Sequence, residues 1–170
     1  MTMRALILSD SHGLTKPLQD IAERYREQVD IMIHCGDSEL DLDAEELKDF
    51  KVVRGNCDFR GAFPEEIVQH ENGITIYVTH GHLHGIKQTL QKLYYRCREV
   101  GATIACFGHS HVLGAEVIDG ILFINPGSIL LPRMRKEKTY AILDTDGKIA
   151  NVTFYTTDGV ELLASSFEIK

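Results

Sequence analysis

The sequence has no apolar run long enough to cross a membrane. A membrane-spanning helix needs about 20 predominantly apolar residues, whereas the first apolar stretch, Ala5–Leu8, ends after four residues at Ser9 and Asp10. That stretch is also too short for the apolar region of a secretory signal. We therefore expect no association with membranes and a cytoplasmic location.

Cysteine is scarce and lacks the spacing of a metal-binding or redox motif. The chain has four cysteines among 170 residues, and no two of them form a C-x-x-C pair. A zinc finger is therefore excluded as an interpretation. Three cysteines, Cys35, Cys97 and Cys106, lie within apolar patterns, so we expect them to be buried and reduced.

Positive charge is also in short supply. The formal net charge is −7, and the longest basic cluster covers only residues 133–138. Proteins that hold long nucleic acids usually present a basic patch. We therefore expect no stable nucleic-acid binding. We interpret Arg133 and its neighbours as a solvated cluster, with a loop that faces the phosphate as the alternative.

Length and pattern indicate one domain that covers residues 1–170. The hydrophobic fraction of 44% is ordinary for a globular chain, and there is no internal repeat, low-complexity segment or linker. Helices are predicted from Thr15, with an apolar stripe that reaches Val29, and over residues 86–100. A short helix with Leu42 and Leu47 facing inward is predicted in the acidic segment that follows residue 38. Strands are predicted at 4–9, 30–35, 51–54, 66–70, 74–79, 103–107, 113–118, 121–124, 139–144, 149–156 and 160–167.

Five short polar signatures occur in order along this chain. At least four of them directly follow a run of β-branched and aliphatic residues. We therefore expect them at the carboxyl ends of strands, where open α/β sheets place their sites. The signatures are Asp10-Ser11-His12, Gly36-Asp37, Gly55-Asn56-Cys57-Asp58, Thr79-His80-Gly81-His82 and Gly108-His109-Ser110-His111.

Two of the signatures have the spacing of a chelating pair. Asp10 and His12 lie two residues apart after a strand and can point the same way toward one ion. His109 and His111 repeat that spacing at another strand end. Aspartate and histidine are ligands of divalent transition metals.

Three further residues complete a set large enough for two ions. Asp37 follows a glycine, which leaves its carboxylate free to bridge two metals. Asn56 offers a neutral amide oxygen, and His80 offers a ring nitrogen. This mixture of ligands suits Mn²⁺, Fe or Zn²⁺ better than Ca²⁺, which prefers oxygen alone. Two such ions form the clamp used for in-line displacement at phosphorus.

These motifs resemble those of the calcineurin-like metallophosphoesterases, over essentially the whole chain. The resemblance is strongest to the small YfcE-like bacterial and archaeal phosphodiesterase branch. It implies an α/β fold, a four-layer αββα sandwich of two packed mixed sheets flanked by helices. It also implies two divalent ions, with Mn²⁺ as the first expectation and Fe, Ni or Zn as alternatives, and a metal-bound hydroxide as nucleophile. By motif, the first metal would take Asp10, His12 and His111, the second Asn56, His80 and His109, with Asp37 bridging the two.

Position 57 departs from the wider family, which commonly has histidine after Gly-Asn. Here Cys57 occupies that position and Asp58 follows. A thiol is a mediocre general acid near neutral pH, so we expect either a good leaving group or another acid, and a small filling role for Cys57 stays open. The expected catalytic residues are Asp37, Asn56, Cys57, Asp58 and His82.

The expected activity is hydrolysis of phosphodiester bonds in small or nucleotide-like substrates. The alternatives are a phosphomonoesterase, a nucleoside polyphosphate hydrolase, or a non-catalytic protein-binding scaffold like the related subunit of the retromer coat. A homo-oligomer that pairs through an edge strand near the C-terminus is also open. Of the remaining histidines, we interpret His34 as a satisfied core residue and His70 as a surface residue, and His84 could face the cleft.

Overall fold

The computed structural model describes residues 2–59 and 63–170, and two β-sheets form its centre. One sheet has six strands in the order β11-β10-β9-β1-β2-β3, and the other has five in the order β4-β5-β6-β8-β7. The strands are β1 (Met3–Leu8), β2 (Ile31–His34), β3 (Phe50–Val52), β4 (Glu66–Glu71), β5 (Ile74–Thr79), β6 (Ile104–Cys106), β7 (Gly114–Ile118), β8 (Ile121–Asn125), β9 (Thr139–Thr145), β10 (Ile149–Thr156) and β11 (Glu161–Glu168). The helical elements are α1 (Lys16–Tyr25), the 3-10 turn η1 (Glu45–Leu47) and α2 (Gln91–Val100).

Both sheets are mixed, and the loops that follow their parallel strands lie at one end of each sheet. In the six-stranded sheet, β1 pairs in parallel with β2, and β2 with β3. In the five-stranded sheet, β6 pairs in parallel with both β5 and β8. The remaining pairs are antiparallel, including the β4–β5 hairpin, whose turn at Asn72 and Gly73 has positive φ at both residues. This is the type I′ geometry that an Asn-Gly sequence favours.

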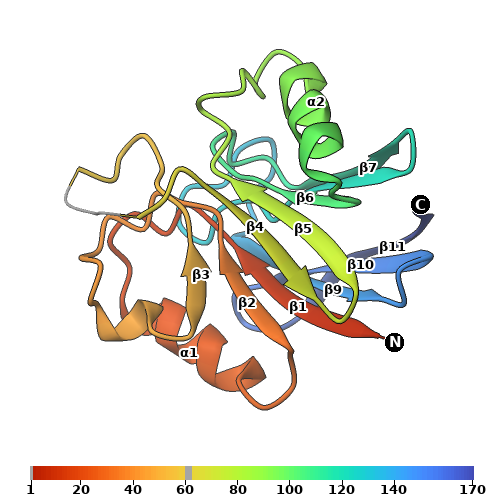
Figure 1. The fold of residues 1–170 in the computed structure, drawn as a ribbon. Helices are drawn as coiled ribbons and strands as arrows, with labels where there is room; N and C mark the ends of the chain where they lie inside the picture. The colour runs from red at the N-terminus through yellow and green to blue at the C-terminus, as the bar shows by residue number, and fades with distance from the viewer. Residues whose placement is uncertain (1, 60–62) are drawn as a thin grey trace.

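Four layers result from how the apolar side chains divide between the two faces of each sheet. One core cluster lies between the sheets and includes Ile7, Ile33 and Val78, all fully buried. A second cluster lies between the six-stranded sheet and α1, and a third between the five-stranded sheet and α2. Figure 1 shows the two helices on opposite sides of the molecule. The expected αββα sandwich is therefore confirmed.

Three details of the expected elements are wrong. The first long helix, α1, ends at Tyr25, so Val29 lies beyond it rather than on its apolar stripe. The second long helix begins at Gln91 rather than at residue 86. Residues before it form turns, because the Thr89 hydroxyl accepts a hydrogen bond from the Gln91 amide at 3.2 Å and local side-chain bonds of this kind compete with a helix. In the acidic segment only Leu47 is buried; Leu42 is 57% exposed because the helical part, η1, begins three residues after it.

The cysteine expectation is confirmed. All four cysteines are free, and Cys35, Cys97 and Cys106 are completely buried. Burial raises the pKa of the Cys97 thiol to about 12, which keeps it protonated and inert. Neither helix of the described chain has the length and apolar character that a membrane crossing would require.

Candidate metal centre

The polar signatures meet at the loop end of the sheets, and their backbone is unusual there. Asp10, His12, Asp37, His109 and His111 all have positive φ, between 42° and 69°. Non-glycine residues rarely adopt this left-handed conformation, and where they do it often marks a functional site. The turns that follow β1, β2 and β6 thus direct the side chains of five candidate ligands through a backbone conformation that most residues avoid.

Glycines in the signatures make room for the ligand side chains. A Cβ on Gly55 would lie 2.0 Å from Asp37 Oδ1, and a Cβ on Gly108 would lie 2.6 Å from Asp10 Oδ2. Any side chain at these positions would therefore collide with a candidate ligand. The glycines are required for close approach, which is why they recur within the signatures.

Asp10, His12 and His111 form the first cluster. Asp10 is fully buried, and its Oδ2 accepts hydrogen bonds from the Ser9 hydroxyl and from the His109 amide. Its other oxygen, Oδ1, lies 3.2 Å from His111 Nε2 and 3.8 Å from the Nε2 atoms of both His12 and His80. Among the described residues, this buried oxygen has no hydrogen-bond partner.

The three imidazoles around Asp10 are each fixed through the opposite ring nitrogen. Nδ1 of His80 lies 2.7 Å from the Cys35 carbonyl, and Nδ1 of His111 lies 2.7 Å from the Leu131 carbonyl. Nδ1 of His12 lies 2.6 Å from Glu39 Oε1. A carbonyl can only accept, so Nδ1 of His80 and His111 carries a proton and Nε2 is the ring atom that faces the acidic side chains, the orientation typical of metal-ligating histidines.

Asp37, Asn56 and His80 form the second cluster. His80 Nε2 lies 3.2 Å from Asp37 Oδ2 and 3.0 Å from Asn56 Oδ1. The other oxygen of Asp37 accepts a hydrogen bond from the Cys57 amide at 2.7 Å. Burial opposes ionisation of Asp37, but the neighbouring His80 outweighs it and lowers the Asp37 pKa to about 2. The ring of His109 packs 5.1 Å from that of His80, so this residue borders the second cluster.

The remaining expected catalytic residues differ in what they contact. Both carboxylate oxygens of Asp58 accept backbone N–H groups, from Asp37, Gly55 and Glu39, so this buried side chain shapes the loop. Cys57 is partly exposed; burial, followed by the charge of Asp37, raises its pKa to about 11. His82 packs 5.4 Å from the His80 ring, and its buried Nδ1 has no partner among the described residues.

Three other histidines lie outside the two candidate clusters. His34 is fully buried, with Nδ1 accepting the Gly36 amide and Nε2 at 2.9 Å from the Ser11 hydroxyl. His70 is exposed on β4. His84, in the loop that leads to α2, makes an edge-on contact with the Tyr77 ring.

Several residues that hold the site together give no signal in the sequence. Glu39 lies two residues after Asp37 in a segment that looks merely acidic, yet it contacts His12. Ser128 donates a hydrogen bond to the Asp10 carbonyl at 2.7 Å, and Ser9 donates to the Asp10 carboxylate. For Ser128 alone the sequence gives an indication, because residues 125–128 resemble the family's sequence after the last histidine motif.

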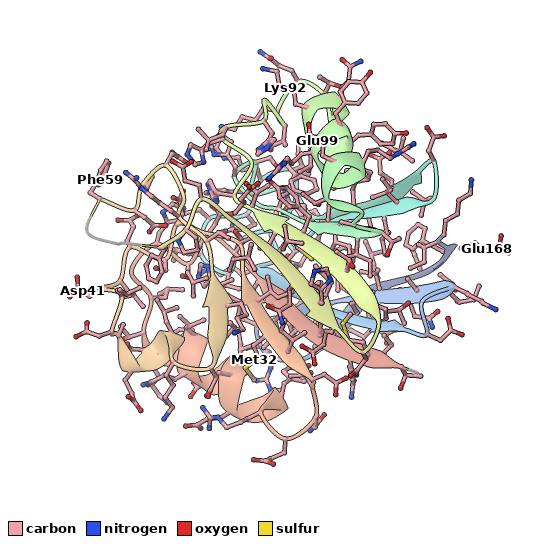
Figure 2. All side chains as sticks on the ribbon, viewed as in Figure 1. Met32, Asp41, Phe59, Lys92, Glu99 and Glu168 are labelled. Atoms are coloured by element: carbon pink, nitrogen blue, oxygen red, sulfur yellow. The ribbon has the colours of Figure 1, made fainter. Side chains whose placement is uncertain are left out.

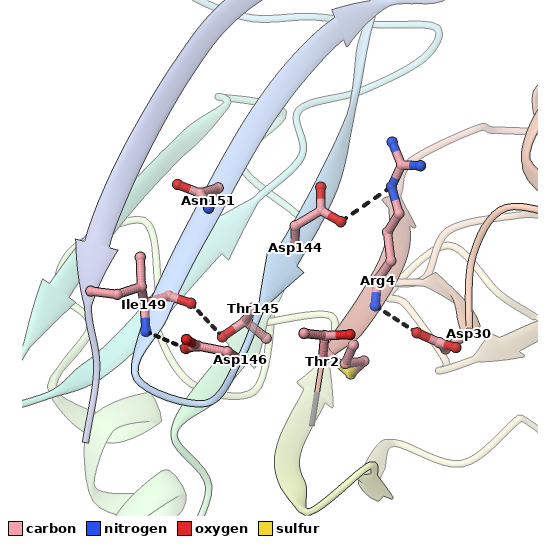
Figure 3. Close-up of a pocket in the computed structure, with 9 residues that line it drawn as sticks. Thr2, Arg4, Asp30, Asp144, Thr145, Asp146, Ile149 and Asn151 are labelled. Atoms are coloured by element: carbon pink, nitrogen blue, oxygen red, sulfur yellow. Dashed lines mark hydrogen bonds and ion pairs between the residues drawn. The ribbon is translucent and has the colours of Figure 1, made fainter.

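A hollow of about 460 Å³ lies at the amino end of β1, away from the candidate ligands (Figure 3). In this hollow Arg4 Nε lies 3.3 Å from Asp144, the Arg4 amide donates to Asp30, and Asp146 accepts the Ile149 amide. No histidine is among the residues that line it in the described chain. The clustered histidine ligands lie at the carboxyl end of β1 instead.

The donor set at the carboxyl end fits divalent metal ions. A buried carboxylate oxygen faced by the Nε2 atoms of three histidines offers a cation several ligand atoms at once. Three sets of side chains lie close enough to hold an ion: Asp10 with His12 and His111, Asp10 with Asp37 and His80, and His12 with Glu39 and Cys57. The mixture of nitrogen and oxygen donors suits Mn²⁺, Fe or Zn²⁺.

Comparison with known proteins gives the same family along almost the whole chain. A family model described as the calcineurin-like phosphoesterase superfamily domain matches residues 3–148. Over 160 residues the chain is 54% identical to the "Probable metallophosphoesterase YsnB" of Bacillus subtilis, a match that covers 94% of this chain and 95% of YsnB.

Two further relatives extend the comparison. The crystal structure of a conserved uncharacterized protein of Streptococcus pneumoniae, described as a predicted phosphoesterase, has a TM-score of 0.95 and 37% identity, and covers 99% of this chain and 98% of that one. The phosphodiesterase YfcE of Escherichia coli is 32% identical over 104 residues, which cover 56% of this chain and 52% of YfcE. The fold, the convergent aspartate and histidine ligands and these matches together show that the chain belongs to the calcineurin-like phosphoesterase superfamily, as a small metallophosphoesterase similar to YsnB and YfcE.

Proposed function

We propose that this protein is a metal-dependent phosphodiesterase that acts on small or nucleotide-like substrates. The observation that carries the proposal is the convergence of His12, His80 and His111 Nε2 on the buried Asp10 Oδ1. Such a convergence of nitrogen and oxygen atoms is suited to binding a cation. We propose two ions, with Mn²⁺ as the first candidate, and a cytoplasmic location.

The assignment of ligands follows the two clusters. Asp10, His12 and His111 would hold one ion, and Asn56, His80 and His109 the other. Asp37 would contribute to both. When bound, two divalent ions neutralise charge on the phosphoryl oxygens and lower the pKa of water, which is the chemistry of hydrolysis at phosphorus.

The chain's own groups supply the rest of the reaction. The His82 imidazole, whose buried Nδ1 is unpartnered, is suited to hydrogen bond with a phosphoryl oxygen. Cys57 carries its proton at neutral pH and lies on the loop beside Asp37, so it is the candidate donor to the leaving oxygen. Asp58 holds this loop in place through three backbone amides.

Two observations support a diester rather than a monoester. Cysteine stands where the wider family has histidine, and YfcE, which is similar to this chain over about half its length, is named a phosphodiesterase. Cys57 is a weaker acid than the histidine of the wider family, which suits esters whose leaving group departs readily.

The test is hydrolysis of bis-p-nitrophenyl phosphate beside p-nitrophenyl phosphate. Protein stripped with a chelator is assayed before and after addition of Mn²⁺, Fe²⁺, Ni²⁺ or Zn²⁺. We expect metal-dependent cleavage of the diester that exceeds cleavage of the monoester. A preference for the monoester would favour a phosphomonoesterase, and no turnover with any metal would favour the protein-binding scaffold.

A further inference from the structure

A groove beside the candidate metal centre has no part in the chemistry described above. It has a volume of about 440 Å³, within the range of small-molecule sites. Phe107 and Phe123 form part of its lining, together with Ile86 and Leu90 from the segment that precedes α2. The lining is thus mainly aromatic and aliphatic.

Building on the proposed function, we propose that this groove binds the organic group of the phosphodiester substrate, and that this group is flat or branched, apolar, and free of a second anionic charge. The groove would set which diesters are cleaved well, while the metal cluster sets the reaction. Three observations carry this proposal: continuity with the metal ligands, the arrangement of charge along the groove, and the open space over Gly114.

The groove and the metal cluster share one loop. Ser110, which lines the groove, stands between the candidate ligands His109 and His111. The Asn125 amide donates hydrogen bonds to the Ser110 hydroxyl at 3.0 Å and to the Gly108 carbonyl at 3.1 Å. Because Asn125 is itself buried at the end of β8, this loop is held rigidly between the two sites. A phosphoryl group at the metal cluster would therefore place a neighbouring substituent at the groove.

Glu116 is the charged residue among those that line the groove in the described chain. Glu116 is exposed, and it pairs with Phe123 on β8. The Gly114–Asn125 pair lies next to the loop that carries His109 and His111, and Glu116 is two residues farther along β7 from that loop. A substrate with its phosphate at the metal cluster and an apolar group along the groove meets the negative charge of Glu116 farther along, which disfavours a second phosphate or carboxylate there.

Gly114 offers a way to fill the groove without disturbing the metal cluster. On β7, Ala115 and Val117 pack against the core between the sheets, so Gly114 and Glu116 point to the opposite face, where the groove lies. A Cβ added at Gly114 would meet no atom within 4 Å. Valine is also a better strand former than glycine. Gly114→Val should therefore fold and reduce the space available to a substrate.

The experiment compares kcat/KM for bis-p-nitrophenyl phosphate and methyl p-nitrophenyl phosphate with Mn²⁺. Both release p-nitrophenolate, and they differ in the group that stays on phosphorus. We expect the ratio of the two values to fall by about tenfold or more in Gly114→Val, the discrimination that one or two methylene-sized changes in an apolar pocket produce. The matched control is Ala164→Val on β11, another edge strand, where the ratio should stay within about twofold of the wild-type value. Comparing ratios between variants removes the intrinsic reactivity of each ester.

An unchanged ratio in Gly114→Val, or an equal fall in both variants, would overturn the groove proposal. Binding separates this failure from failure of the proposed function. Calorimetry with benzylphosphonate, which is not hydrolysed, should show at least about tenfold weaker binding to Gly114→Val than to the wild type. That result without any diester hydrolysis would reject the phosphodiesterase and keep the groove as a binding site, whereas equal binding would reject the groove.

Discussion

Five of the seven candidate metal ligands hold their side chains in place with a left-handed backbone. Asp10, His12, Asp37, His109 and His111 have this conformation, while Asn56 and His80 do not. Such a conformation costs of order 1–3 kcal/mol per residue and persists only where the surroundings fix it. Here the fixing groups are visible: the Asp10 amide bonds to the Gly36 carbonyl, and the His12 amide to the Asp37 carbonyl. Two ligand loops thereby hold each other in position.

Glu39 is the residue that we expect to tune the metal site through another side chain. Its carboxylate lies 2.6 Å from His12 Nδ1 and keeps Nε2 directed at the first cluster. Loss of such a partner commonly costs 10–100-fold in metal affinity. We expect Glu39→Ala to weaken Mn²⁺ binding by about that factor, with Glu39→Gln, which can still accept the hydrogen bond, in between.

Calorimetric titration with Mn²⁺ measures this effect directly. Glu45→Ala is the matched control. Glu45, on η1, is also acidic, but it pairs with Lys48 and not with a candidate ligand. Equal Mn²⁺ affinity in Glu39→Ala and Glu45→Ala would show that Glu39 does not position His12.

The role of Cys57 as proton donor predicts a dependence on the leaving group. A general acid contributes about 10²–10⁴-fold when the leaving oxygen must be protonated. We expect Cys57→Ala to lose about 100-fold on a dialkyl phosphate and only a few-fold on bis-p-nitrophenyl phosphate, whose leaving group departs unprotonated. Rate measurements on both esters decide the matter. A loss of no more than a few-fold on the alkyl ester would leave Cys57 as a filler beside the metal site.

At the scale of elements, each helix is attached to its sheet mainly by a few fully buried side chains. On α2 these are Leu93 and Cys97, while Lys92 projects away from the body of the protein (Figure 2) and Glu99 is exposed. The attachment matters for the site because α2 follows directly on the loop that carries His80 and His82. Stability of this loop is therefore linked to packing of the helix.

Leu93→Ala tests that packing. Removal of a fully buried leucine side chain leaves a cavity and typically costs 2–5 kcal/mol, so we expect the free energy of unfolding to fall by about that amount. The neighbouring change Lys92→Ala, on the outer face, should stay within about 0.5 kcal/mol. Urea unfolding of both variants provides the comparison, and a loss below about 1 kcal/mol in Leu93→Ala would show that α2 packs loosely.

Elements with a strong pattern were predictable, and those set by local side-chain bonds were not. The β4–β5 hairpin follows from two alternating runs around Asn72 and Gly73. The start of α2 could not be predicted, because Ile86 continues the helical stripe in sequence but instead packs against Gly81 in a turn. Leu42 likewise fits a helical stripe, but η1 is too short to include it.

At the scale of the whole molecule, buried histidine makes stability depend on pH. Burial lowers the His34 pKa from 6.5 to about 4. Between these values the unfolded chain binds a proton that the folded protein does not, so acidification favours unfolding. We expect the free energy of unfolding to fall by about 1.4 kcal/mol per pH unit from this group as the pH drops from 6.5 toward 4.

Other groups titrate as well, so the effect is isolated by mutation. In chelator-treated protein, His34→Gln should show a flatter dependence on pH than the wild type over this window, measured by urea unfolding at several pH values. His70→Gln, on the exposed side of β4, is the matched control. The same slope in His34→Gln and the wild type would contradict the assignment of this proton to His34.

The candidate ligands could be chosen from the sequence, but their arrangement could not. Strand-end positions and spacing predict seven candidate ligands, and the fold brings the loops that carry them together. Their role as ligands stays a prediction. The left-handed backbone at His12 or His111, and the contact of Glu39 with His12, depend on loops that meet only in the folded chain. Single-domain organisation over residues 1–170 and the edge-strand homo-oligomer stay predictions. Sedimentation analysis of the protein would test the oligomer.

The most direct test of the central claim is a Mn²⁺ titration of chelator-treated protein with binding and hydrolysis of bis-p-nitrophenyl phosphate followed together. If both clusters hold an ion, calorimetry should show two equivalents per chain, and hydrolysis should reach its plateau only as the second is filled. Asp37→Asn, which removes the carboxylate shared by the two clusters, should lose the second equivalent and most of the activity. Hydrolysis by metal-free protein, or Mn²⁺ binding that leaves both the diester and the monoester intact, would contradict the account.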